Sequence, residues 1–431
     1  MPVEINRKKA PGSKQINFRI NSEPRYFQLG NGIPVYIIDK GIQEVTRIEL
    51  VFKAGTYYQD HFHAAKATNK LLIAGANSYS AEDISEHFEF YGSYIETNNS
   101  KDNAYIRLYT LNKYLNETLP MLAEVVMNPV FPDHETDIYR STRKERLYIK
   151  RQNVNYLAST HFYEQVFGST HPYGCILEPG HLDGLGRDIL AEHHKNNYRA
   201  DECTIIVSGK IPMQLDDLLE KTFGSFSGAN SKNRTLNVPP IITSTEKKRF
   251  IHKKDAMQAA LCIGKATINR LHPDYPEFSI VNTVLGGYFG SRLMKNIRED
   301  KGYTYGISSA LISFHHSGLF IIFSEVGNKV LEASIEEVYK EIRKLREEPI
   351  RQKELKLVKN FLMGALMRSM DGPFEIAKRL GVVLEYGQSL DTFNHFIKIL
   401  KGISPERIQE LANKYLQEDS LFLTIAGNNE A

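Results

Sequence analysis

Arg298 and Tyr305 are the residues of this chain whose types and spacing are best suited to chemistry. Residues 291–300 have a pattern typical of a helix that ends before Gly302, and residues 303–312 are typical of a strand. Arg298 would then lie in the last helical turn and Tyr305 near the start of the strand, so both side chains can face one corner. A guanidinium and a phenol are donors, and donors placed where a carbonyl oxygen gains negative charge lower the barrier to peptide hydrolysis.

The same two residues also have a purely structural interpretation. Arg298 could pair with the last carbonyl groups of its helix, and Tyr305 could pack on the half-buried face of its strand. Even in the catalytic interpretation, these donors could assist peptide hydrolysis but could not start it. From the two residues alone the structural interpretation is the simpler one, so the choice depends on the rest of the chain.

The elements around them are predicted from turn residues and hydrophobic periodicity. Ser80 with Asp83 three residues later predicts a capped helix. The first half is predicted to contain two strands that form a hairpin, then this helix, then a strand and two further helices. These elements fall at residues 34–38, 46–55, 80–92, 93–110, 115–128 and 133–151.

The second half repeats the order of the first. Residues 260–267 correspond to residues 50–55, and both halves end in an apolar strand closed by glycine, at 203–209 and 421–427. Strand runs mixed with helix pairs, without strict alternation, favour antiparallel-rich sheets. The chain is therefore predicted to be an α+β protein of two duplicated domains, each an antiparallel-rich mixed sheet covered by helices.

A segment rich in small, polar and proline residues separates the two halves. Such a composition is typical of an exposed linker. We therefore place the first repeat at residues 16–225, the linker at 226–245 and the second repeat at 246–431. A length of 431 residues suits two domains, each large enough to bury its own core.

Composition excludes several classes of function. The net charge of +3 gives no overall field for nucleic acid or an anionic membrane. No window approaches a membrane span, and the first residues lack the apolar core of a signal peptide. Cys175, Cys203 and Cys262 form no close pair, which argues against a disulfide framework. We expect a cytoplasmic protein with neither nucleic acid nor membrane as a partner.

Several strings along the chain match a known family in type and order. They are Asn31-Gly-Ile-Pro-Val-Tyr, Lys53-Ala-Gly-Thr, Tyr91-Gly-Ser-Tyr-Ile-Glu-Thr and His171-Pro-Tyr-Gly. From about Asn31 to Gly427 the organisation resembles the pitrilysin/insulinase peptidases, especially the two-domain branch that includes mitochondrial processing peptidase. Active members of that family hold zinc through H-x-x-E-H, whose two histidines face one metal and whose glutamate is the general base.

This chain departs from the family at that motif. The corresponding positions hold Lys66, Asn69 and Lys70. A protonated ammonium cannot ligate zinc, and an asparagine cannot take a proton from water. The comparison with the family therefore implies that this chain binds no metal and no other cofactor.

Other potential metal sites are no better supported. The family's third ligand, a glutamate in the helix at 133–151, would fall on or beside Arg146, with Glu145 adjacent. Among the histidines, His161 and Glu164 come nearest to the motif, but Gln165 stands where the last ligand would be. An exposed helix face explains that segment more simply than a metal site.

Arg298 and Tyr305 match, by type and spacing, an arginine and a tyrosine of the family's second domain. In the family these residues hold the substrate backbone and help to stabilise the charged intermediate. The resemblance therefore implies a subunit without zinc that pairs with a related chain bearing H-x-x-E-H. The two chains would enclose a peptide that binds as an added strand. Arg298 and Tyr305 would reach the zinc site of the partner and assist the reaction there.

Two alternatives remain. The chain could be a catalytically inactive pseudo-peptidase that acts as a scaffold or peptide-binding module, either with a partner or as a homodimer. Hydrolysis by this chain alone would need a site that the sequence does not display, since there is no G-x-S-x-G element or placed Cys/His pair.

Overall fold

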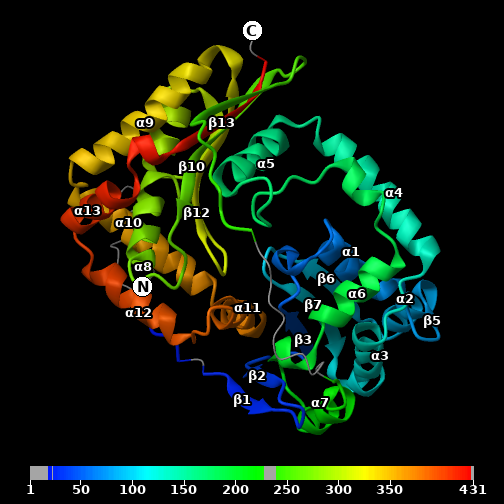
Figure 1. Cartoon of the computed structure of the whole chain (residues 1–431). Helices are drawn as coiled ribbons and strands as arrows, with labels where there is room; N and C mark the ends of the chain where they lie inside the picture. Colours follow the sequence, from blue (N-terminus) through cyan, green and yellow to red (C-terminus); the bar gives the residue numbers. More distant parts are fainter. Residues whose placement is uncertain (1–17, 22, 228–238, 429–431) are drawn as a thin grey trace, which may run out of the picture.

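The computed structural model describes residues 18–21, 23–227 and 239–428. Each half of the chain contributes one mixed sheet with helices against it (Figure 1). The first sheet has the order β1-β2-β8-β3-β7-β6, and the second has the order β11-β12-β10-β13-β9. The predicted α+β class is confirmed.

The strands of the first sheet are β1 Arg25–Gln28, β2 Pro34–Asp39, β3 Val45–Phe52, β6 Tyr94–Asn99, β7 Ala104–Leu111 and β8 Cys203–Gly209. Those of the second sheet are β9 Lys248–His252, β10 Gln258–Thr267, β11 Thr304–Ser313, β12 Gly318–Gly327 and β13 Phe422–Gly427. A separate two-stranded ribbon consists of β4 Gly75–Ala76 and β5 Tyr79–Ser80.

The helices of the first half are α1 Ala64–Leu71, α2 Ala81–Phe90, α3 Leu115–Met127, α4 Asp133–Lys150, α5 Val154–Phe167, α6 Arg187–Asn197 and α7 Leu215–Phe223. Those of the second half are α8 Tyr275–Leu285, the π-helical segment η6 Met294–Asp300, α9 Leu331–Glu347, α10 Gln352–Arg368, α11 Gly372–Leu384, α12 Asp391–Gly402 and α13 Pro405–Tyr415. Single 3-10 turns occur at Thr56–Tyr58, Leu72–Ala74, Asn112–Tyr114, Pro179–Leu182, Ala200–Glu202, Asn328–Val330 and Glu418–Ser420.

The two sheets have the same topology, which confirms the duplication predicted from the sequence. The order β6-β7-β3-β8-β2 in the first half corresponds to β11-β12-β10-β13-β9 in the second. In both sheets the last pair is parallel, β2 with β8 and β13 with β9, and the other pairs are antiparallel. The predicted domain boundaries remain a prediction, because residues 228–238 of the proposed linker lie outside the described residues.

Two details of the strand prediction are wrong. β2 and β3 do not form a hairpin, because β8 lies between them, parallel to β2 and antiparallel to β3. The segment 93–110 is not one strand but the hairpin β6–β7. Its turn is closed by Ser100, whose Oγ accepts hydrogen bonds from the amides of Asp102 and Asn103.

The predicted helices lie where expected. Asp83 N donates to Ser80 Oγ at 3.1 Å and Ser80 N donates to Asp83 Oδ2 at 2.8 Å, so α2 begins with the predicted capping box. The helix predicted before Gly302 forms as well, and Gly302 has a φ of +66°. It differs from expectation in its hydrogen bonding, because η6 is π-helical.

One helix from each half packs on the sheet of the other half. α5 packs on β10 and β13, and α11 packs on β8 and β2 (Figure 1). The side chains of β10 alternate accordingly. Leu261 and Ile263 lie in the core of the second half, while Ala260 and Cys262 belong to a third buried cluster that also contains Phe162 of α5. The small side chains of β10 let α5 approach closely, so the two halves share part of their core.

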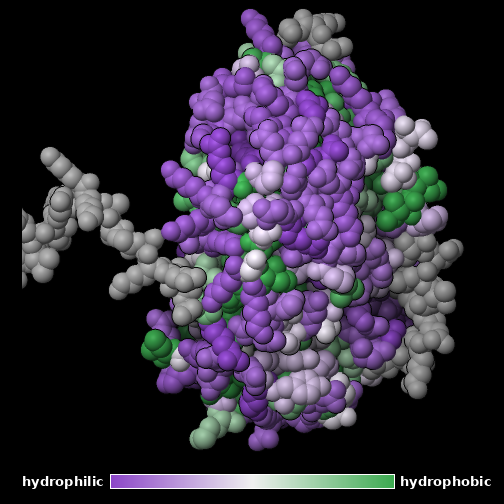
Figure 2. All heavy atoms as spheres, turned by 90° about the vertical axis from the view of Figure 1, so that its left-hand side faces the viewer, coloured by the Kyte–Doolittle hydropathy of each residue, from purple (hydrophilic) through white to green (hydrophobic). Residues whose placement is uncertain are grey.

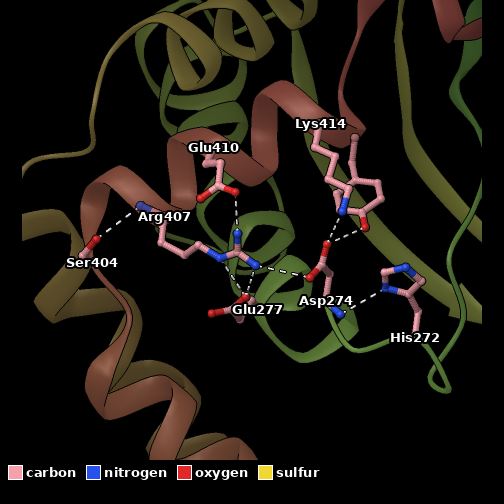
Figure 3. Close-up of polar contacts among 8 residues, drawn as sticks. His272, Asp274, Glu277, Ser404, Arg407, Glu410 and Lys414 are labelled. Atoms are coloured by element: carbon pink, nitrogen blue, oxygen red, sulfur yellow. Dashed lines mark hydrogen bonds and ion pairs between the residues drawn. The ribbon is translucent and has the colours of Figure 1, made fainter.

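An ion-pair network joins α13 to the start of α8 (Figure 3). Arg407 donates to Glu277 Oε2 at 2.6 Å and to Asp274 Oδ1 at 3.2 Å. Lys414 Nζ and Tyr415 Oη both donate to Asp274 Oδ2 at 2.7 Å, and these two donors are the largest causes of the lowered pKa of Asp274. Asp274 and Glu277 also place negative charge at the N-terminus of α8, where the helix dipole favours it.

The side of the molecule that shows the outer helices of the second half is mostly hydrophilic, with apolar residues in small groups (Figure 2). This matches helices that bury one face and expose the other. No helix among the described residues has both the length and the apolar character needed to cross a bilayer.

Candidate functional site

The three positions that correspond to the zinc motif lie on α1, but they do not share one cavity. Asn69 is buried, with 2% of its surface exposed. Lys66 and Lys70 are exposed one helical turn apart on α1, and they line two adjacent cavities.

Lys66 lines a cavity of about 320 Å³ together with Lys101, Arg143 and Lys150, and we call it the basic cavity. No carboxylate is among its lining residues. Lys101 Nζ donates to the carbonyl oxygens of Pro172 at 3.0 Å and Tyr173 at 3.2 Å. The other three cations take part in no ion pair among the described residues.

Electrostatic repulsion within the basic cavity affects its ionisable groups. The pKa of Lys66 is lowered to about 8, first because the cavity walls partly withdraw its ammonium group from water and then because Lys101, Arg143 and Lys150 lie near. His63, at the start of α1, has its pKa lowered to about 3 by burial and by the charges of Arg143 and Lys66. Its Nε2 lies 2.8 Å from Tyr139 Oη. His63 is therefore neutral at physiological pH and occupied by a hydrogen bond.

A second cavity, of about 650 Å³, lies beside the first between α1, α2, α4 and strand β6, and we call it the edge-strand groove. Strand β6 is the last strand of its sheet, so one side of its backbone is not paired within the sheet. Lys70, Arg143 and Arg146 line the groove. Arg146, the expected third-ligand position, thus faces Lys70 across it, whereas Glu145 lines neither cavity.

These donor sets do not fit zinc. Ammonium and guanidinium groups line both cavities, and neither binds a cation while protonated. In the part of the chain that the structure describes, no group of three or more His, Cys, Asp or Glu side chains could hold a metal ion. His161 forms an ion pair with Glu164 at 3.6 Å, and Glu164 also accepts from Arg249 at 2.7 Å, which supports the structural interpretation of that segment.

The structure brings Arg298 and Tyr305 together. The Arg298 guanidinium lies 5.5 Å from the ring centre of Tyr305 and 4.5 Å from that of Phe289. Tyr305 is 92% exposed and Phe289 is also exposed, while Arg298 is half-buried between them and the protein surface, so this corner of the second half presents the Tyr305 hydroxyl to solvent. Neither Arg298 nor Tyr305 is among the residues that line the basic cavity or the edge-strand groove.

The tips of two equivalent hairpins meet where the halves join, and sequence reasoning missed this contact. Asp102 in the β6–β7 turn accepts from Tyr173 Oη at 2.6 Å and from the backbone amide of His315 in the β11–β12 turn at 3.0 Å. Nearby, Tyr105 of β7 donates to Glu385 at the end of α11. Only the fold brings these residues together, since they come from both halves of the chain.

The contact at Glu385 predicts a pH dependence of stability. Burial, and next the charge of Asp102, raise the pKa of Glu385 from its ordinary value to about 7, against an opposing hydrogen bond from Tyr105. A folded-state pKa above the unfolded value favours the protonated carboxyl group, so its stabilisation is complete below about pH 4.5 and is lost as pH rises through about 7. Between about pH 6 and pH 9 the free energy of unfolding should fall by about 1 kcal/mol from this group.

Urea unfolding at the two pH values measures this fall, with Glu385→Gln as the matched variant. The variant keeps the shape and the hydrogen-bond acceptor but cannot ionise, so its decrease should be smaller by that amount. An equal decrease in both proteins would show that Glu385 is ionised in the folded state near neutral pH.

Comparison with known proteins agrees with these observations. Residues 35–177 match "Insulinase (Peptidase family M16)" and residues 184–362 match "Peptidase M16 inactive domain". The chain is 26% identical to the uncharacterized zinc protease YmxG of Bacillus subtilis over 83% of this chain and 86% of that protein. It is 21% identical to the non-peptidase homolog YmxG of Helicobacter pylori, over 92% of each.

A solved structure shares the fold. It is described as the peptidase M16 inactive domain from Pseudomonas fluorescens, and it superposes with a TM-score of 0.86 at 23% identity, over 95% of this chain and 99% of the other. The family matches, the duplicated topology and the strings found in the sequence all agree. The chain belongs to the insulinase family of peptidases, family M16.

Proposed function

We propose that this chain is the metal-free subunit of a two-chain zinc peptidase, in which a related chain bearing H-x-x-E-H holds the zinc. The observation that carries the proposal is a difference between two sets of residues, those at the zinc-motif positions and the pair Arg298 and Tyr305. Lysine and asparagine stand at the zinc-motif positions, while Arg298 and Tyr305 stand together at an exposed corner. A chain that worked alone would have no use for exposed donors without a metal.

The donors have a clear task in such a complex. Peptide hydrolysis develops negative charge on the carbonyl oxygen, and the Arg298 guanidinium and Tyr305 hydroxyl would donate hydrogen bonds to it or to the neighbouring substrate backbone. Contact with the Arg298 guanidinium at one ring face leaves the Tyr305 hydroxyl free to point away from the protein. The peptide would be enclosed between the two chains, paired as an added strand.

The test uses the chain alone and co-purified with a zinc-motif relative. We expect no peptide turnover by the isolated chain and turnover by the complex. Arg298→Ala and Tyr305→Phe should each lower kcat/KM of the complex by about 100-fold, the size expected when one donor to a developing oxyanion is lost. Lys295→Ala is a matched control, since it removes an exposed cation from the same helical segment.

Other outcomes favour different functions. Unchanged turnover in both variants would overturn the assisting role and favour a catalytically inactive scaffold or peptide-binding module. The lack of catalysis in that alternative agrees with the name of the Helicobacter relative, a non-peptidase homolog. Chelator-sensitive cleavage by the isolated chain, with one zinc per molecule, would overturn the proposal altogether.

A further inference from the structure

We infer that the former zinc region is an anion-recognition site, and that the peptide this chain binds along β6 carries carboxylate side chains. This inference rests on the proposed function for the presence of a peptide, and it adds the chemical class of that peptide. It is carried by the arrangement of cations on α1 and α4, by the lack of ion pairs to them within the described part of the chain, and by the free edge of β6 next to them.

The cations are concentrated on two facing helices. Lys66 and Lys70 come from α1, and Arg143, Arg146 and Lys150 come from one side of α4. None of the five forms an ion pair among the described residues. The Nε atom of Arg143 is buried without a hydrogen-bond partner. Like charges held this close cost free energy unless an anion balances them, so the arrangement suits a ligand of opposite charge.

Arg143 connects this charge to the place where a peptide would lie. Its side chain lines both the basic cavity and the edge-strand groove. Ser93, Tyr94 and Ile95 at the start of β6 form one wall of the groove. A peptide added to β6 would direct every second side chain toward α1 and α4. Those side chains would meet Lys70, Arg143 and Arg146.

The carboxylates of the groove only partly offset this charge. Glu89 and Glu135 line the groove against Lys70, Arg143 and Arg146, which leaves one positive charge in excess. Neither carboxylate forms an ion pair with these cations among the described residues, and Glu89 accepts a hydrogen bond from Ser85 Oγ at 3.0 Å, on α2. Glu135 precedes Arg143 by two turns of α4, which places it about 12 Å along the helix. The basic cavity itself contains hydroxyl, amide and aromatic groups besides its cations and no acid. The region thus favours acidic peptides and disfavours basic ones.

The test measures binding of fluorescent twin peptides to the full chain, one with glutamate and the other with glutamine at alternate positions. At low salt the glutamate peptide should bind about tenfold more tightly or better, and the preference should largely disappear in high salt. Arg143→Gln and Arg146→Gln should each reduce the preference about threefold or more. Lys144→Gln is the matched control: it lies on the same helix and removes the same charge, but Lys144 is paired with Asp183.

Three results would overturn the inference: equal affinity for the two peptides, absence of binding by both, or an equal effect of Lys144→Gln. Tighter binding of a single-stranded oligonucleotide of the same charge would instead assign the site to nucleic acid. Failure here is distinguishable from failure of the proposed function. A complex that cleaves neutral peptides with full dependence on Arg298 and Tyr305 would keep the function and reject the acidic preference.

Discussion

Replacing Phe162 by alanine should destabilise the protein by about 3–5 kcal/mol, the usual cost of truncating a buried phenylalanine. Phe162 lies on α5 with none of its surface exposed, in the cluster that α5 forms with the second sheet. Ala260 and Cys262 of β10 are its neighbours in that cluster and are too small to fill the space left behind. We therefore expect a cavity and little relaxation around it.

The location of the defect gives this prediction a second observable. α5 belongs to the first half of the chain but covers the sheet of the second half. Hydrogen exchange at the backbone amides of β10 and β13 should accelerate in Phe162→Ala, because those strands lose the helix that protects one face. Phe90→Ala on α2 is the control, since Phe90 is 82% exposed and its loss should be within about 0.5 kcal/mol. Equal effects of the two substitutions would contradict the shared core.

This exchange of helices shows where prediction from the sequence ends. Periodicity and turn residues identified strands, helices, caps and the duplication, because these depend on neighbours along the chain. Nothing local indicates which sheet a helix covers. Ala260 and Cys262 read as an ordinary strand, and their small size has a meaning only once α5 lies against them. The insertion of β8 between β2 and β3 escaped prediction for the same reason.

The same limit applies to the candidate site: the sequence gives the chemistry of its residue types but not their arrangement in space. The residue types at Lys66, Asn69 and Lys70 are enough to exclude zinc ligation, because that conclusion depends on chemistry. Where the three side chains point depends on the orientation of α1, which residue types do not give, and Asn69 is buried. The basic cavity was not predicted, since Lys101 comes from a hairpin turn and Arg143 from α4. Only the tertiary fold brings these charges together.

Replacing Glu49 by alanine should also cost about 3–5 kcal/mol, because it leaves the buried Arg47 without an acid and removes one of the two acids of Arg107, whose other partner is Glu96 at 3.5 Å. Glu49 lies at the centre of β3 with 4% of its side chain exposed. It accepts hydrogen bonds from Arg47 at 2.5 Å and from Arg107 on the neighbouring strand β7. Arg47 in turn donates to the carbonyl oxygen of Phe374 on α11 at 3.1 Å, so the pair reaches the helix that the second half lends to the first sheet.

The measurement is urea unfolding of Glu49→Ala, of Glu49→Gln and of a double variant of Glu49→Ala that also carries Arg47→Leu. Glu49→Gln keeps an acceptor and should lose less, and the double variant should recover part of the loss of Glu49→Ala because the unpaired buried charge of Arg47 is gone. Glu332→Ala removes the acid of an exposed pair with Lys248 and should leave the free energy of unfolding unchanged within error. If Glu49→Ala behaved like Glu332→Ala, Arg47 would have to be hydrated in the folded protein, and its contact with Phe374 of α11 would be looser than the hydrogen bond of 3.1 Å implies.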